Sequence, residues 1–113
     1  MSQYLDQNII AELKEIMADD LPMLFEAYLE DSSRNLNSLA QAIDTQDADQ
    51  VRRIAHSIKG SSRNVGATDL ALQCEQLENA AKDKILDNSQ QALQNINQIF
   101  QQTSEEIKQT YLN

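Results

Sequence analysis

Residues 56–66 of the chain read His56-Ser57-Ile58-Lys59-Gly60-Ser61-Ser62-Arg63-Asn64-Val65-Gly66. This stretch contains the single histidine and both glycines of a 113-residue sequence. The apolar and small side chains around it recur at helical spacing and place Gly60 inside a helix, where a glycine costs about 1 kcal/mol relative to alanine. We therefore expect Gly60 to leave bare backbone one turn from the imidazole, where another molecule can come close. Gly66 is expected to end the helix.

The helix that carries this stretch is expected to begin after Asp47, whose side chain can cap it. Its buried positions follow the helical repeat and are Ala48, Val51, Ile54, Ala55, Ile58, Ser62 and Val65. A longer helix precedes it, and its start is marked by the acidic caps Asp19 and Asp20 and by Pro22 in the first turn. A short turn over residues 44–47 separates the two.

Three further helices are predicted from the same periodicity. A short one covers about residues 6–17 with Asp6 as its N-cap, a fourth runs from Ala67 to about Ala81, and a fifth begins at Ser89 as its cap. Short connections between long amphipathic helices favour antiparallel neighbours. The sequence therefore predicts an all-α protein, an up-and-down antiparallel four-helix bundle over about residues 20–110 with a short additional N-terminal helix.

The composition agrees with one helical domain and limits where the protein works. Two glycines, one proline and no tryptophan among 113 residues are typical of an all-helical chain. A single cysteine, Cys74, forms no internal disulfide, and its place on an apolar face indicates a small buried hydrophobe rather than a nucleophile. The N-terminus lacks the pattern of a signal peptide, and no stretch approaches the roughly 18 apolar residues of a membrane span. We expect a cytoplasmic monomer.

Charge is distributed unevenly along the sequence. The net charge of −9 disfavours binding to nucleic acid or to an anionic membrane. Between Gln50 and Thr68, however, there are four basic residues and no acidic one, namely Arg52, Arg53, Lys59 and Arg63. This local excess of positive charge around the only histidine is a candidate anion site.

A helical wheel places His56 on the outside of its helix. With Val51 at zero, His56 falls at about 140°, Arg52 at about 100°, Lys59 at about 80° and Arg63 at about 120°. The imidazole is thus expected in water among cations, which favour its neutral, nucleophilic form. Such an arrangement suits capture of a phosphoryl group on nitrogen, with Lys59 in reach of the phosphoryl oxygens. From the wheel alone, a solvated surface histidine is an equally good interpretation.

The amino-acid sequence around His56 favours a functional histidine over a merely solvated one, because it resembles the signature of a known family. Ala55-His56-Ser57-Ile58-Lys59-Gly60-Ser61-Ser62, followed by Val65-Gly66-Ala67, resembles the signature of histidine-containing phosphotransfer (HPt) domains. The similarity is tightest over residues 51–81, and the helix pattern fits nearly the whole chain. It implies a single HPt domain over residues 1–113, a phosphorelay module of two-component systems that has no ATP site of its own.

The resemblance also implies roles for individual residues. His56 would accept a phosphoryl group from a receiver-domain aspartate and pass it to another receiver, Lys59 would contact the phosphoryl oxygens, and Gly60 would leave clearance for the partner. Some family members hold a glutamine at the position of Glu78, whose carboxylate would here orient the imidazole through Nδ1–H. Arg52, Ser57 and Arg63 are expected to meet the partner. The partners implied are response-regulator receiver domains and, as a further candidate, a hybrid sensor kinase.

Other interpretations remain open at this stage. The chain could be a helical adaptor that binds receivers without phosphorylation of His56, or a hydrolase with a histidine nucleophile, although a second acid or base is lacking. One histidine and one buried cysteine on different helices give no zinc site, and the acidic residues follow no calcium-loop spacing. We expect no cofactor and no metal. The first helix is expected to offer apolar contacts to a partner through Ile9, Ile10 or Leu13.

Overall fold

The computed structural model describes residues 4–113, which form helices and no strands. The helices are α1 (Gln7–Met17), a short 3-10 turn (Ala18–Asp20), α2 (Leu21–Asp44), α3 (Ala48–Asn64), α4 (Thr68–Lys82) and α5 (Ser89–Tyr111). The molecule measures 41 × 22 × 21 Å along its principal axes. Within residues 4–113, no helix combines the length and the apolar character that crossing a membrane requires.

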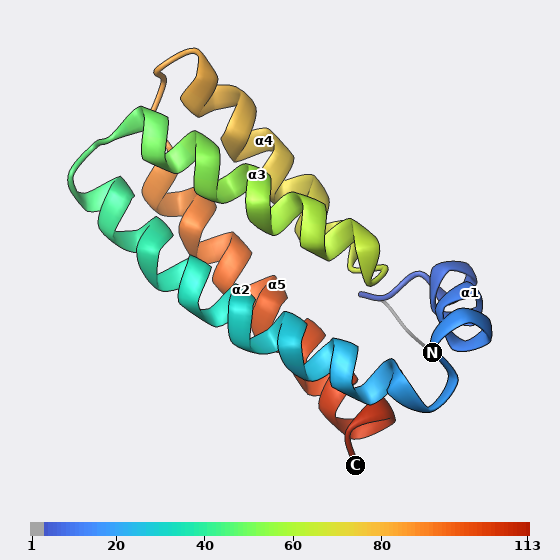
Figure 1. The fold of residues 1–113 in the computed structure, drawn as a ribbon. Helices are drawn as coiled ribbons and strands as arrows, with labels where there is room; N and C mark the ends of the chain where they lie inside the picture. Colours follow the sequence, from blue (N-terminus) through green and yellow to red (C-terminus); the bar gives the residue numbers. More distant parts are fainter. Residues whose placement is uncertain (1–3) are drawn as a thin grey trace.

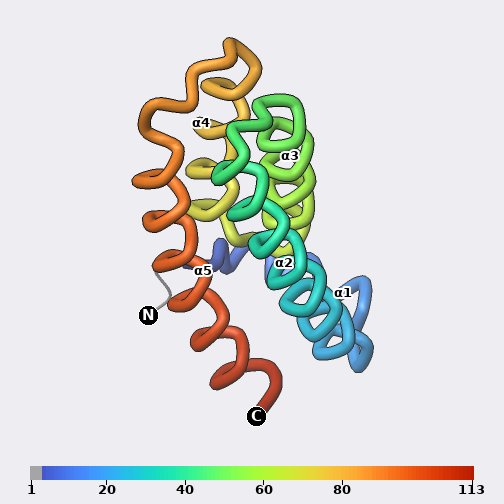
Figure 2. The backbone as a smooth tube through the Cα atoms, turned by 90° about the vertical axis from the view of Figure 1, so that its left-hand side faces the viewer, coloured from blue at the N-terminus to red at the C-terminus, as the bar shows by residue number. Residues whose placement is uncertain are grey.

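Helices α2 to α5 run alternately up and down and form a four-helix bundle, as the sequence predicted (Figure 1). The most extensive packing is between α3 and α4, and each of these helices also packs against a long outer neighbour, α2 or α5. Because α2 and α5 have 24 and 23 residues while α3 and α4 have 17 and 15, the outer pair extends beyond the inner pair. Helix α1 lies at this extended end (Figure 2).

Two of the predicted caps are confirmed and two are wrong. The Asp6 carboxylate accepts hydrogen bonds from the backbone N–H groups of Asn8 and Ile9, and Asp47 accepts one from Gln50. Asp20 makes no capping hydrogen bond, because the preceding 3-10 turn already gives it helical dihedral angles (φ −85°, ψ −5°). Ser89 does begin α5, but its hydroxyl donates backwards to the Leu86 carbonyl, at 2.7 Å, instead of capping.

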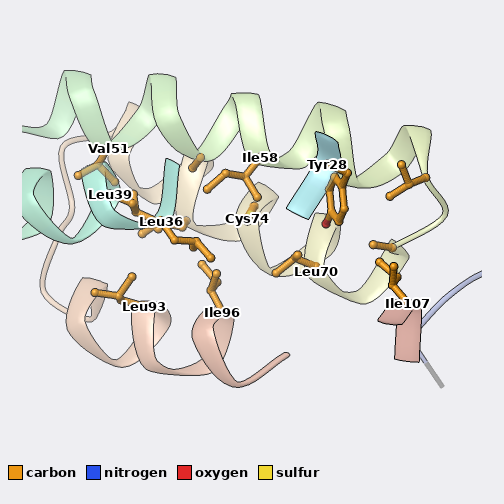
Figure 3. Packing of buried hydrophobic residues seen from close by; sticks show 14 of the residues in the cluster. Tyr28, Leu36, Leu39, Val51, Ile58, Leu70, Cys74, Leu93, Ile96 and Ile107 are labelled. Atoms are coloured by element: carbon orange, nitrogen blue, oxygen red, sulfur yellow. The ribbon is translucent and has the colours of Figure 1, made fainter. Parts of the chain in front are cut away.

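The core fills the space between the four long helices (Figure 3). Each helix contributes fully buried side chains, including Phe25 and Leu39 from α2, Val51 and Ile58 from α3, Leu70 and Cys74 from α4, and Ile96 and Ile107 from α5. One polar contact crosses this core, where the hydroxyls of Tyr28 and Ser62 lie 2.8 Å apart. Burial is the main reason that the pKa of Tyr28 rises to about 12, so the phenol stays neutral and the pair serves as a neutral link between α2 and α3.

Gly66 joins α1 to the turn between α3 and α4. Its φ of +82° lies in the left-handed region, and its carbonyl accepts a hydrogen bond of 2.8 Å from the backbone N–H of Asp6. A Cβ on Gly66 would lie 3.3 Å from the Asp6 carbonyl and 3.4 Å from the Ile9 side chain. In α1, Ile10 is 1% exposed and belongs to the core. Of Ile9, Ile10 and Leu13, which were expected to offer contacts to a partner, Ile10 is therefore excluded, whereas Ile9 and Leu13 are half-buried.

Substitution of Gly66 by alanine should lower the free energy of unfolding by about 1–2 kcal/mol, because alanine is strained at this φ and its methyl group crowds the start of α1. Gly60→Ala is the matched control. Gly60 lies inside α3 with no atom near its missing Cβ, so this change should stabilise the fold by about 1 kcal/mol. Urea unfolding of both variants measures the difference, and a Gly66→Ala protein as stable as wild type would contradict the described role of this turn.

Candidate functional site

Helix α3 presents His56 to solvent because its opposite side is committed to the core. Val51, Ala55 and Ile58 are completely buried against α2 and α4. Since each residue advances about 100° around the axis, burying these positions turns residue 56 outward. The His56 side chain is accordingly 63% exposed. The predicted position of the imidazole on the bundle surface is confirmed.

The side chain closest to the imidazole comes from the next helix and is a carboxylate. Glu78 of α4 places its Oε2 at 2.8 Å from His56 Nδ1. Its other oxygen, Oε1, lies 2.7 Å from the Lys59 ammonium and forms an ion pair with it. The structure therefore brings together His56, Lys59 and Glu78. A single carboxylate contacts both the imidazole and the lysine.

The contacts of Glu78 change its acidity. Burial acts to raise the pKa of this carboxyl, but the hydrogen bonds and charges of Lys59 and His56 act in the opposite direction and outweigh it, so the pKa lies below its ordinary value of 4.5. Glu78 and Lys59 each retain 15% exposure in their side chains. The site thus contains an ionised carboxylate with an ammonium on one oxygen and an imidazole on the other.

The column of cations expected from the wheel is partly neutralised in the fold. Lys59 is paired with Glu78, and Arg63 forms an ion pair with Glu75, also on α4. Arg52 is half-buried and has no ion-pair partner within residues 4–113. A helical wheel of α3 leaves out the acidic side chains of α4. The sequence analysis therefore overestimated the positive charge around His56. In the sequence, the two ion pairs could have been anticipated from Glu75 and Glu78, which are three residues apart beside the apolar face of α4.

Gly60 leaves open space beside the imidazole. It is exposed, and apart from its two chain neighbours and the backbone of its own helix turn, nothing in the described chain lies within 4 Å of the position a Cβ would occupy. Close packing between helices of this molecule therefore does not explain the glycine. Ser57 is also exposed on this face. Together these small residues leave a low surface next to His56.

The remaining candidate residues lie apart from this surface. Cys74 is fully buried, and burial, assisted by the nearby charge of Glu78, raises the pKa of its thiol to about 12, as expected of an inert core residue. Residues 4–113 contain no group of three histidine, cysteine or acidic side chains that could hold a metal ion. Hollows of about 410 and 490 Å³ are lined by other parts of the bundle, and neither borders His56. The hydrolase interpretation gains no support from them.

Comparison with known proteins identifies the family. The model of the Hpt domain matches residues 23–109, which is most of the chain. The chain belongs to the Hpt domain family. As an Hpt protein it is a phosphorelay intermediate of two-component signalling, and Hpt proteins relay phosphoryl groups with receiver domains. The matched domain is a phosphotransfer domain and not a kinase domain.

Individual relatives agree with this assignment. The chain is 30% identical over 101 residues to the phosphorelay protein LuxU of Vibrio vulnificus, covering 88% of each chain. It is 32% identical over 80 residues to histidine-containing phosphotransfer protein 4 of Arabidopsis thaliana, where the match covers 66% of this chain and 62% of the plant protein. The structure superposes on that of HptB from Pseudomonas aeruginosa PAO1 with a TM-score of 0.94 and 34% identity over 96% of this chain and 95% of the other.

Replacement of Glu78 by glutamine should lower the free energy of unfolding at neutral pH but not in acid. A carboxyl whose pKa is depressed in the folded state contributes stability above its unfolded value of 4.5, and this contribution is lost as the pH falls through the folded value. Denaturant unfolding of both proteins at about pH 7 and about pH 3 measures the effect. A difference that stays the same at both pH values would show that the ion pair with Lys59 contributes nothing.

Proposed function

We propose that His56 is the residue that carries the phosphoryl group, receiving it from the aspartyl phosphate of one receiver domain and passing it to another. The observation that carries this proposal is the orientation of the ring. Nδ1 faces Glu78, while the side chain is 63% exposed and no described residue forms a hydrogen bond with Nε2. Nε2 is therefore the nitrogen that a docked aspartyl phosphate can reach.

In this proposal His56, Lys59 and Glu78 have different roles. Glu78 accepts a hydrogen bond from Nδ1–H, which fixes the tautomer whose Nε2 lone pair is free to attack phosphorus. As the N–P bond forms, the bond from phosphorus to the aspartate oxygen breaks and the carboxylate of the receiver is regenerated. Lys59 lies 2.7 Å from Glu78, the same carboxylate that contacts the ring, and its ammonium is proposed to contact the phosphoryl oxygens. The donor already holds the energy, so positioning supplies most of the acceleration.

The surface around His56 is proposed as the docking face for receivers. Gly60 and Ser57 supply the clearance, and Arg52, which has no ion-pair partner in the described chain, is available to an acidic rim. Arg63 can join it by exchanging its contact with Glu75. On this proposal residues 1–113 act as a single HPt domain, a monomer in the cytoplasm, with receiver domains as partners and a hybrid sensor kinase as a further candidate.

Phosphorylation should require both a receiver and His56. Incubation with labelled acetyl phosphate alone is expected to leave the protein unlabelled, whereas addition of a receiver domain that acetyl phosphate phosphorylates should transfer label to it. The label should be acid-labile and base-stable, as a phosphoramidate is, and absent in His56→Gln. A His56→Gln protein that still binds the receiver identifies the adaptor function if wild type also stays unlabelled.

Enlarging residue 60 should affect a protein donor more than a small one. In Gly60→Gln, the added side chain obstructs the approach of the receiver backbone, so transfer from a phosphorylated receiver should slow by about tenfold or more. Loading of His56 by phosphoramidate, a donor of a few atoms, should slow far less. Rapid-quench measurement with both donors tests this, and an equal loss with both would show that Gly60 is not a clearance position.

A further inference from the structure

The carboxylate of Glu78 lies against the nitrogen of the ring that the phosphoryl group does not use. Its Oε2 is 2.8 Å from His56 Nδ1, and its Oε1 is 2.7 Å from Lys59 Nζ. Both oxygens are occupied, and only 15% of the side chain is exposed. One carboxylate thus contacts the imidazole and the ammonium at the same time.

The state of Nδ1 decides how well the ring can leave a phosphoryl group on Nε2. With a proton on Nδ1, the N–P bond breaks with its electron pair on Nε2 and leaves a neutral imidazole, while an oxygen of the acceptor carboxylate, or of water, bonds to phosphorus. With a bare Nδ1, the same step would expel an imidazolate anion, so a proton would have to be supplied. A ring that keeps its Nδ1 proton needs no external acid in this step.

We propose that Glu78 keeps the proton on Nδ1 of phosphorylated His56 and thereby makes the ring a good leaving group when the phosphoryl group is handed on. This inference rests on the proposed function and extends it from arrival of the phosphoryl group to its departure. The same proton stays on Nδ1 throughout: the ring is neutral before attack, cationic while it carries the phosphoryl group, and neutral again afterwards. A carboxylate in contact with an N–H favours the cationic ring.

The ionisation of Glu78 suits this role. Burial acts to raise its pKa, but contacts with Lys59 and His56 lower it further than burial raises it, so the carboxylate stays charged through the neutral range. An ionised Glu78 can only accept a hydrogen bond, so it can take one from Nδ1–H. Lys59 contributes indirectly, because its ammonium on Oε1 helps to keep Glu78 ionised.

Among the charged groups around the imidazole, Glu78 is the acidic side chain that contacts it. Besides His56, the titratable and charged residues of α3 are Asp49, Arg52, Arg53, Lys59 and Arg63, and those of α4 are Asp69, Cys74, Glu75, Glu78 and Lys82. From α2, the buried Tyr28 contacts Ser62 of α3. The cations oppose a positive ring, and Glu75 is engaged by Arg63. Cys74 and Tyr28 stay neutral in the core. The proton on Nδ1 thus depends on one carboxylate.

The test is the pH profile of the phosphorylated protein. Wild type and Glu78→Gln are loaded with phosphoramidate, and loss of the phosphoryl group from His56 to water is followed over about pH 5–10. As the pH rises, the rate of phosphoryl loss from wild type should begin to fall about one pH unit or more later than the rate from Glu78→Gln. The reason is that glutamine can accept the hydrogen bond but carries no charge. Glu75→Gln is the matched control on the same helix and should keep the wild-type profile.

Nitrogen-15 NMR of the ring reports the same proton directly and needs only the wild-type protein. Phosphorylated His56 should keep its Nδ1 proton to a higher pH than free Nε2-phosphohistidine. Identical profiles for wild type and Glu78→Gln, or a ring that loses its proton no later than the free compound, would overturn the inference. Failure of the proposed function looks different, since His56 would then take no label from any phosphorylated receiver.

Discussion

The packing of α3 against its neighbours imposes the constraint on which the site depends. Val51, Ala55 and Ile58 are completely buried, and the helical repeat then leaves His56 on the outer side of the bundle. The same packing holds α4 beside α3, so a side chain of α4 can reach across to the ring. The exposure of His56 and the position of its neighbours on α4 thus have one origin. The site gains a fixed geometry without being enclosed.

Ion pairs between α3 and α4 surround His56. The chain carries a net charge of −9, and yet the stretch around the histidine is basic. Two of those cations are matched by Glu75 and Glu78, which stabilises the α3–α4 contact and reduces the positive field at the ring. In the described chain Arg52 then has no ion-pair partner, and Lys59 is paired with Glu78.

On the proposed function, the open surface around His56 allows two receiver domains to reach the imidazole in turn. Both donor and acceptor are expected to approach the same exposed imidazole, so the surface must be open from the start. Gly60 has nothing near its missing Cβ, and the described hollows of the molecule lie elsewhere. On the proposed function, the specificity of phosphoryl transfer resides in protein–protein docking and not in a pocket for a small substrate. This agrees with membership of the Hpt family, whose domain model matches residues 23–109.

The helices, their order and the outward position of His56 could be predicted from the sequence alone, because they follow from the spacing of apolar side chains along single helices. The sequence also determined the caps at Asp6 and Asp47 and the stop at Gly66, which depend on neighbours a few residues away. It did not determine the cap at Ser89 or the burial of Ile10, where packing of distant segments decides. The contact of Glu78 with His56 was expected from the family resemblance, whereas the contacts of Glu78 with Lys59 and of Glu75 with Arg63 are seen only in the tertiary structure. They join residues on two helices whose relative rotation is fixed by the shared core, and no periodicity within either helix specifies that rotation.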